Sequence, residues 1–381
     1  MRGGDCGPMS KVDAAAPLAS PGLDYALRLI SGEATGSVAA VLRCGLSLLS
    51  GVYAVGLAAF LLPYRVGIRR RKRLPCPVIS IGNITFGGAG KTPTVRTIAR
   101  ELQQRGLGVV ILSRGHGGSA RGATVVSDGR ERLLAPEVCG DEPAMLADLL
   151  PGIPVIVGRN RYESGMLAVN TFGPDIILLD DGMQYWQLHR DLDVVLINAV
   201  QPFGYGRLMP RGALREPVSG LRRAGAVLIT NSDRVSQDCL DALRERIMDL
   251  APSALVVDAE HKAVDLRSLG GGRRGIDWLR GRKVATLSSI GTPGLFTQSV
   301  AELGGEVVHS FEFPDHHMWR AEEIDAICSR SLELGAEALV TTEKDAVKIG
   351  MVELDLPMLA LDILVDFKRE GFVGSLVDMV K

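Results

Sequence analysis

The sequence predicts an α/β fold with two sheet domains, the second smaller than the first, behind an N-terminal membrane-associated helix. Two observations lead to this prediction: a charge-free apolar run at residues 44–64, and an alternation of β-branched runs with helical patterns from residue 77 onward. The runs are continuously apolar, which indicates parallel strands covered by helices on both faces. The expected strands are residues 77–83, 108–114, 154–158, 175–181, 193–199, 226–231, 254–260, 283–291, 306–313, 338–345 and 361–367.

The N-terminal part contains a membrane signal. Residues 1–37 are rich in Gly, Ala, Pro and Ser, and we expect them to be a flexible lead-in. Residues 38–74 hold the apolar run Cys44–Tyr64 and then the basic stretch RVGIRRRKR. A run of about 20 apolar residues can span a bilayer, and basic residues after it favour the cytoplasmic side. The alternative is a buried core helix, and spanning and interfacial placements both stay open.

Bulk properties set the remaining boundaries. We expect a first domain at residues 75–255, a linker at residues 256–282 around LGGGRRG, and a C-terminal α/β domain at residues 283–381. A formal net charge of −1 predicts no nucleic-acid partner. The six cysteines form no CxxC pair, so the sequence gives no indication of a zinc site.

The stretch GNITFGGAGKTPTVRT, residues 82–97, follows the first expected strand and leads into a helical pattern. Strand, glycine-rich turn and helix N-terminus form a phosphate-binding loop, or P-loop, in which a lysine reaches the phosphates and a hydroxyl binds Mg²⁺. Thr85 occupies the place where the strict P-loop pattern has a glycine, and a structural turn is the alternative. The first domain is thus predicted to be P-loop NTPase-like. Its expected nucleotide-binding residues are Gly87, Gly88, Ala89, Gly90, Lys91, Thr92 and Pro93.

Acidic residues stand at two further places. Asp180 and Asp181 end the strand DIILLDD, where ligands bind in parallel sheets, and we expect them, with Thr92, near a metal. A turn or helix cap is the alternative. Asp141 precedes a proline and a helical pattern in CGDEPAML, which fits either a helix N-cap or a reactive carboxylate.

Histidines and arginines complete the candidate residues. FEFPDHHMW places His316 and His317 beside Asp315 after a strand, where a histidine can tune a carboxylate or can be structural. Two loops carry guanidinium groups suited to anions, although surface arginines are often only solvated. These arginines are Arg207, Arg211 and Arg215 in GYGRLMPRGALREP, and Arg159 and Arg161 in VGRNR.

The ordered motifs GNITFGGAGKTP, LSRGHGG, GDEP, VGRNR, DDGMQ, RDLD, GRLMPRGALREP, FPDHH and TTEKDAV resemble the tetraacyldisaccharide 4′-kinases of lipid A biosynthesis. The resemblance runs from about residue 41 to the C-terminus. It implies transfer of the ATP γ-phosphoryl group to the 4′-hydroxyl of a tetraacylated glucosamine disaccharide 1-phosphate, which gives lipid IV-A. It also implies ATP and Mg²⁺ as cofactors and the cytoplasmic face of the inner membrane as the location. We further expect a monomer.

The resemblance also implies roles for individual residues. Lys91 and Thr92 correspond to the P-loop lysine and threonine, and Asp180 and Asp181 to the acidic pair near Mg²⁺. Asp141 corresponds to the catalytic aspartate, His316 to its histidine partner, and Arg215 to a phosphate contact. Asp141 would accept the 4′-hydroxyl proton, and His316 would support its basicity. Because Asp141 falls in the expected first domain and His316 in the second, we expect the site between them, completed by closure.

The chain departs from the family pattern at His116, and at Met183-Gln184-Tyr185, where Tyr185 replaces a histidine. Two other functions stay open. One is a membrane-tethered P-loop ATPase switch, which Phe86 disfavours because partitioning ATPases have a lysine there. The other is a soluble small-molecule kinase with an ordinary core helix at residues 44–64.

Overall fold

The computed structural model describes residues 21–291, 293–315, 317–350 and 354–381, which form two compact units. Of the described residues, unit 1 comprises those in the ranges 21–114, 160–261 and 365–381, and unit 2 those in the ranges 115–159 and 262–364. This division differs from the expected one, because residues 115–159 join the later part of the chain and residues 365–381 return to the earlier part. The expected linker also differs: most of its first half belongs to β8 (Leu255–Ser268), a strand that runs from unit 1 into unit 2.

Unit 1 contains a parallel sheet in the order β8, β7, β6, β1, β5, β2. Every residue of β1, β2, β5 and β7 is buried, which confirms the expectation of strands covered on both faces. The bounds are β1 (Val78–Asn83), β2 (Val109–Ser113), β5 (Ile176–Asp180), β6 (Leu192–Asn198) and β7 (Ala226–Thr230).

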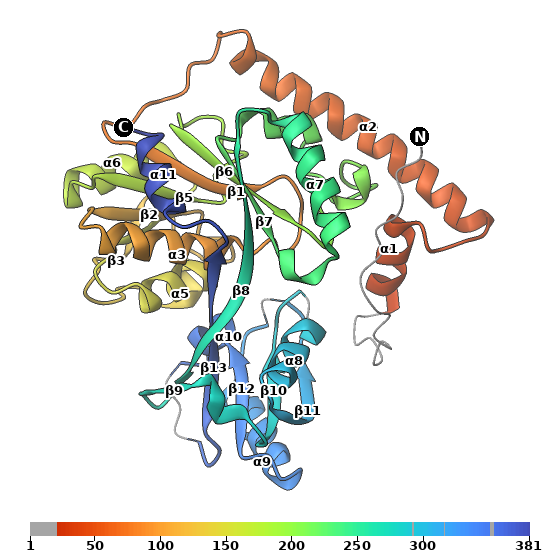
Figure 1. Cartoon of the computed structure of the whole chain (residues 1–381), viewed down its shortest axis with the longest axis vertical. Coiled ribbons are helices and arrows are strands. Elements are labelled where there is room, and N and C mark those ends of the chain that lie inside the picture. Colours follow the sequence, from red (N-terminus) through yellow and green to blue (C-terminus); the bar gives the residue numbers. More distant parts are fainter. Residues whose placement is uncertain (1–20, 292, 316, 351–353) are drawn as a thin grey trace. The chain divides into compact units, whose positions relative to one another are not determined.

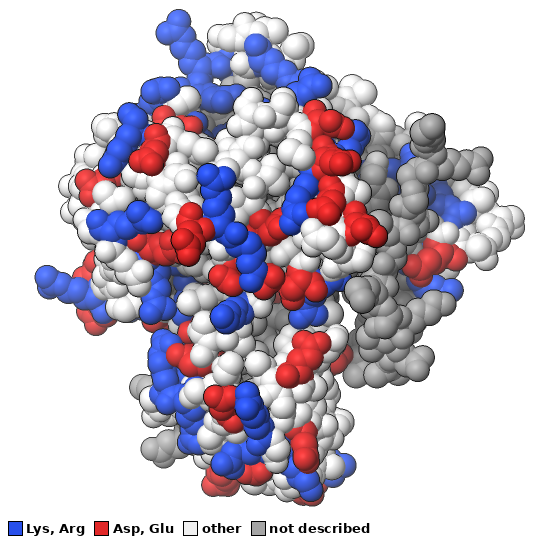
Figure 2. Space-filling view, in the orientation of Figure 1, with Lys and Arg blue, Asp and Glu red and all other residues white. Residues whose placement is uncertain are grey.

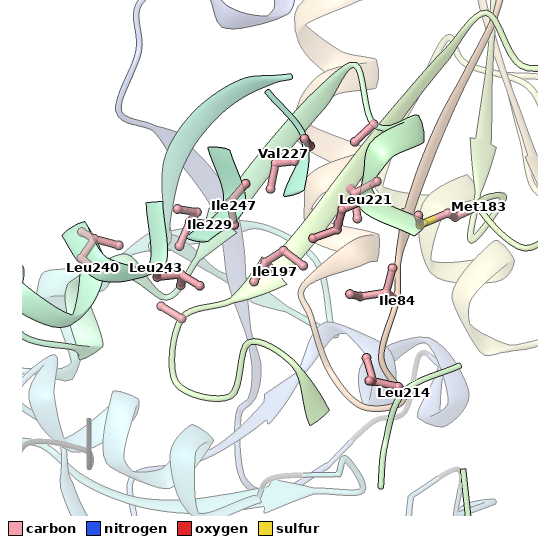
Figure 3. Close-up of a cluster of buried hydrophobic side chains, with 14 residues drawn as sticks. Ile84, Met183, Ile197, Leu214, Leu221, Val227, Ile229, Leu240, Leu243 and Ile247 are labelled. Carbon is pink, nitrogen blue, oxygen red and sulfur yellow. The ribbon is translucent and has the colours of Figure 1, made fainter. Parts of the chain in front are cut away.

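Helices cover this sheet, and α3 contacts β1, β2 and β5 (Figure 1). The bounds are α3 (Lys91–Gln104), α6 (Arg161–Phe172), α7 (Gln237–Leu250) and α11 (Phe372–Asp378), with short 3₁₀ turns at Gly204–Gly206, Val218–Arg223 and Ser232–Arg234. Figure 3 shows one core of this unit, in which side chains of α7 pack on those of β6 and β7. Ile84 and Leu214 close one end of that core and so fix the two loops that carry them.

The N-terminal apolar segment forms the long helix α2 (Ser37–Arg65), with α1 (Pro21–Ser31) against it (Figure 1). Helix α2 is not a core helix, because only 6% of its most apolar window is buried. Its exposed side chains include Leu48, Val52 and Val55. Basic side chains gather near the end of α2 that leads into residues 65–73, whereas charges of both signs are interspersed elsewhere on the visible face (Figure 2). Of the expected lead-in, residues 1–20 lie outside the described residues, and residues 21–31 are helical.

Unit 2 contains a parallel sheet in the order β11, β10, β12, β13. Two antiparallel pairs accompany it, β3 with β4 and β9 with the second half of β8, and the sequence did not predict β3 or β9. The strands are β3 (Thr124–Ser127), β4 (Val155–Val157), β9 (Arg273–Gly275), β10 (Lys283–Ser288), β11 (Glu306–Glu312), β12 (Ala338–Thr342) and β13 (Met358–Phe367), the last ending in unit 1. The helices are α4 (Pro136–Cys139), α5 (Asp141–Leu149), α8 (Pro293–Glu302), α9 (Ala321–Glu333) and α10 (Glu343–Ile349), with a 3₁₀ turn at Ile276–Leu279.

Candidate phosphate-binding site and acidic residues

The predicted P-loop has the expected local structure, because β1 ends at Asn83 and α3 begins at Lys91. Gly90 caps α3 in the left-handed conformation, with φ 76° and ψ 27°. A Cβ atom on Gly90 would lie 2.3 Å from Nε2 of His261, so only glycine fits both the backbone and the space. The loop therefore presents its backbone amides at the N-terminus of a helix, which favours bound anions.

Position 85, where the strict pattern has glycine, does not require a glycine in this structure. It forms an antiparallel bridge with Leu214, and the amide of Phe86 donates to the carbonyl of Ala213 at 2.7 Å. Thr85 does not have a positive φ, and extended backbone accommodates β-branched residues well. The first part of the loop is therefore fixed by pairing with the segment around Leu214 rather than by glycine.

Asp181 lies between two cations. Its Oδ1 is 3.7 Å from Nζ of Lys91, and Nη1 of Arg215 donates to its two oxygens at 2.8 and 2.9 Å. Burial raises the pKa of Asp181, but Lys91 and Arg215 outweigh burial, so that its pKa lies below the ordinary value. Asp181 has a φ of 49°, which is uncommon outside glycine. The structure thus brings together three predicted residues, two of them cationic.

Gln184 organises this cluster, and the sequence did not assign it a role. It donates to the carbonyl of Asn83 at 2.8 Å and accepts from Arg215 at 3.2 Å. Arg215 also stacks on the ring of Phe86, 4.6 Å from its centroid. The sequence signals for Gln184 were its place in the motif DDGMQ and its position three residues after the strand-end pair. These contacts hold the guanidinium of Arg215 over the start of the P-loop.

Asp180 and Thr92 are both buried, with 3% and 9% of their surfaces exposed. Asp180 accepts a hydrogen bond from Ser113 at 3.2 Å, and its charge also acts on Arg161. Carboxylate and hydroxyl oxygens suit Mg²⁺, which is usually held by one or two carboxylates together with phosphates rather than by a protein cage. No cluster of three or more acidic, His or Cys side chains that could hold a metal occurs among the described residues. Thr92, Asp180 and Asp181 carry oxygen atoms of the kind that Mg²⁺ prefers, and their part in metal binding stays a prediction.

The other predicted arginines lie elsewhere. Arg211 donates to the carbonyl of Ile30 at 2.9 Å and so binds the end of α1. Arg161 is buried at the first turn of α6, where its amide donates to the hydroxyl of Tyr185 at 3.1 Å. Tyr185, the departure from the family pattern, thus supports the start of α6. Arg159 belongs to unit 2.

Asp141 is the first residue of α5 and is 8% exposed. The N-cap is Gly140, so the interpretation of Asp141 as an N-cap is wrong. The grouping of Asp141 also differs from the expected one, because residues 115–159 belong to the same unit as residues 262–364. His316 lies outside the described residues, whereas Asp315 and His317 are described and belong to the same unit as Asp141.

Comparisons with known proteins agree with these observations. The family model "Tetraacyldisaccharide-1-P 4'-kinase" matches residues 42–381. A tetraacyldisaccharide 4′-kinase of Anaeromyxobacter sp. (strain Fw109-5) is 44% identical over 82% of this chain and 84% of its own length. One of Halothermothrix orenii is 38% identical over 80% and 82%. A crystal structure of LpxK from Aquifex aeolicus in complex with ATP has a TM-score of 0.73 and 30% identity, covering 89% of this chain and 99% of that one. The chain therefore belongs to the tetraacyldisaccharide 4′-kinase family.

Proposed function

We propose that this kinase transfers the γ-phosphoryl group of ATP to the 4′-hydroxyl of a tetraacylated glucosamine disaccharide 1-phosphate and forms lipid IV-A. The observation that carries the proposal is the P-loop, whose lysine pairs with Asp181, the carboxylate that Arg215 also contacts, in a chain of this family. Phosphoryl transfer requires positioning and charge neutralisation more than covalent chemistry by the protein.

Each residue of this cluster has a role in the proposal. The loop amides of residues 87–92 and the ammonium group of Lys91 bind the β- and γ-phosphates. Arg215 contacts the transferred phosphoryl group, to which its guanidinium can form two parallel hydrogen bonds. Thr92, Asp180 and Asp181 would hold Mg²⁺, which when bound neutralises the developing charge on the phosphate oxygens.

Asp141 is proposed as the general base that accepts the 4′-hydroxyl proton, with His316 supporting its basicity. Asp141 is the first residue of α5 and is largely buried.

A transfer assay tests the proposal. The purified chain with Mg-ATP and the disaccharide 1-phosphate is expected to give a bisphosphorylated product by mass spectrometry. An ATP hydrolysis rate that is the same with and without the acceptor would instead favour a P-loop ATPase switch. Asp141→Asn is expected to abolish most turnover and to leave ATP binding intact. Asp148→Asn is the matched control on the same helix, since Asp148 forms a half-exposed ion pair with Arg132.

We also propose that α2 lies in the interface on the cytoplasmic face of the inner membrane and does not cross it. The hydroxyls of Ser50 and Tyr53, near its middle, donate to the carbonyls of Leu208 and Arg215 at 2.9 and 2.6 Å. A helix whose midpoint is bound to a globular domain cannot place that midpoint at the bilayer centre. Flotation with anionic vesicles tests this: Val52→Ser combined with Val55→Ser is expected to reduce binding, because both exposed valines lie outside the contact with the domain.

A further inference from the structure

The motif TTEKDAVK, residues 341–348, has no role in the proposed chemistry, yet it contains a fully buried ion pair. Asp345 and Lys348 form an ion pair of 2.9 Å in which both side chains are completely buried. Such a pair is costly to bury unless its remaining hydrogen-bonding capacity is satisfied. Both members are satisfied, by groups that come from three different segments.

The carboxylate of Asp345 accepts from all sides. Its Oδ2 accepts from the amide of Ser289 at 2.9 Å and from the hydroxyl of Thr342 at 2.7 Å. Its Oδ1 accepts from the hydroxyl of Ser289, from Nε1 of Trp319 at 3.3 Å and from Lys348. One aspartate therefore joins the end of β10, the start of α10 and the segment after β11.

The ammonium group of Lys348 is also fully hydrogen-bonded, because its three N–H bonds have three acceptors. These are Asp345, the hydroxyl of Ser289 at 2.6 Å and the backbone carbonyl of His317 at 2.9 Å. A backbone carbonyl as the third acceptor means that Lys348 fixes the course of the chain at residue 317 rather than one side chain.

A second lysine of α10 holds the other side of position 316. Nζ of Lys344 donates to Oδ1 of Asp315 at 2.7 Å, in an ion pair whose aspartate is half-exposed. Lys344, Asp345 and Lys348 therefore hold residues 315, 319 and 317, respectively.

His317 has a structural environment of its own. Its Nε2 lies 3.2 Å from Oε2 of Glu323, which also caps α9, and its ring packs 4.8 Å from Phe313 and 4.6 Å from Trp319. These contacts give His317 a structural role in the packing of this segment. The neighbouring position 316 is the one to which the proposed function assigns a part in proton transfer.

Helix α10 also packs against α5, the helix that begins with Asp141. We propose that α10 is the positioning element of the kinase: Lys344, Asp345 and Lys348 hold Asp315, Trp319 and His317 on the same body as Asp141, so that the residues flanking position 316 keep a fixed place relative to the proposed base. The inference rests on the proposed roles of Asp141 and His316. None of the three α10 residues needs to touch ATP or the acceptor.

Two variants and one control test this in the full-length kinase. Lys348→Met removes the bond to the chain at residue 317, and Lys344→Met removes the partly exposed pair with Asp315. Arg282→Gln is the control, because Arg282 forms an exposed ion pair with Glu337 in the same unit. Measurements are kcat and KM for ATP, and hydrogen–deuterium exchange of the peptide spanning residues 313–320.

Lys348→Met is expected to speed exchange in that peptide and to lower kcat about 10- to 100-fold with KM for ATP unchanged, since small misplacements of catalytic groups have effects of this size. Lys344→Met is expected to lower kcat several-fold, and Lys344→Arg to restore it by pairing with Asp315 again. If Lys348→Met does not fold, the Lys344 pair of variants decides alone.

Two results would overturn the inference and differ from each other. The positioning role alone is refuted if the chain is an active kinase and Lys344→Met leaves kcat unchanged. It is also refuted if Lys344→Met lowers kcat and Lys344→Arg does not restore it. If the unmodified chain phosphorylates no disaccharide acceptor, the proposed function is refuted, and the positioning role is refuted with it. The exchange measurement does not depend on activity, so it still shows whether α10 holds residues 313–320.

Discussion

Gly90→Ala is the sharpest test of the P-loop geometry, because two independent features of the structure oppose any side chain there. The backbone of Gly90 has a φ of 76°, a left-handed conformation. The added methyl group would lie 2.3 Å from Nε2 and 2.7 Å from Cε1 of His261. His261 cannot move without loss, since its Nδ1 is 2.9 Å from Oδ1 of Asn231.

The magnitude follows from these two contributions. A left-handed conformation costs a non-glycine residue about 1–2 kcal/mol. Breaking the hydrogen bond between His261 and Asn231 adds about 0.5–1.5 kcal/mol. The free loop can relax to avoid both costs, but the ATP-bound loop must adopt the conformation of the cradle. Since about 1.4 kcal/mol is tenfold in affinity, the Kd for Mg-ATP should rise by about 10- to 300-fold.

Isothermal titration calorimetry with Mg-ATP measures this change, and a second substitution separates its parts. In a His261→Ala background the steric contribution disappears, so that Gly90→Ala should there raise Kd by only the backbone contribution of about 1–2 kcal/mol. The reasoning is refuted if Gly90→Ala binds Mg-ATP as tightly as the unmodified chain. An equal penalty in both backgrounds would refute the part assigned to His261.

Three further predictions concern neighbouring residues. Arg215→Gln should raise the pKa of Asp181 and lower kcat/KM for ATP by about 10- to 100-fold in steady-state assays, since hydrogen bonds to a charged group contribute about 1.5–3 kcal/mol; unchanged kinetics would show that the pair is dispensable. Thr85→Gly should lower the free energy of unfolding by about 0.5–1 kcal/mol in urea titrations and leave ATP affinity unchanged. Tighter ATP binding by this variant would show that the nucleotide-bound loop requires a glycine at position 85. Burial holds the pKa of His261 below 6.5, so the unfolded state takes up the proton first and stability falls as the pH drops below 6.5, by up to about 1.4 kcal/mol per pH unit. Urea unfolding between about pH 5 and 7 should show that slope reduced in His261→Gln, and an equal slope would assign it to other groups.

The sequence predicted what depends on neighbouring residues in the chain. Continuous apolar runs identified the long strands, since a strand buried on both faces has no polar alternation. The P-loop was predictable because its strand, glycines and helix are consecutive. The bridge between Thr85 and Leu214 was not, because it joins residues 129 positions apart and leaves no local pattern. A missing glycine therefore weakened the match to a pattern without weakening the site.

The division into units was not predictable for the same reason. Residues 115–159 follow β2 in the chain, and order along the chain assigned Asp141 to the first domain. In the structure this segment packs with residues 262–364, and α5 lies against α10, about 200 residues later. Pairs of helices in contact at such separations carry no periodic signal. Asp141 shares one unit with Asp315 and His317, so no closure between units is needed to bring these three residues onto one body.

Two aspartates show what a strand-end carboxylate signal can and cannot decide. Asp181 follows β5 directly, and Asp345 follows β12 within three residues, so both meet the sequence criterion for a ligand at the end of a parallel strand. Asp345 is completely buried and its oxygens are occupied by donors of its own unit, which leaves no capacity for a ligand. Asp181 keeps one third of its side chain exposed and lies beside two cations that a phosphate would also attract. The surrounding donors, which come from segments distant in the chain, decide which carboxylate binds and which one holds the fold.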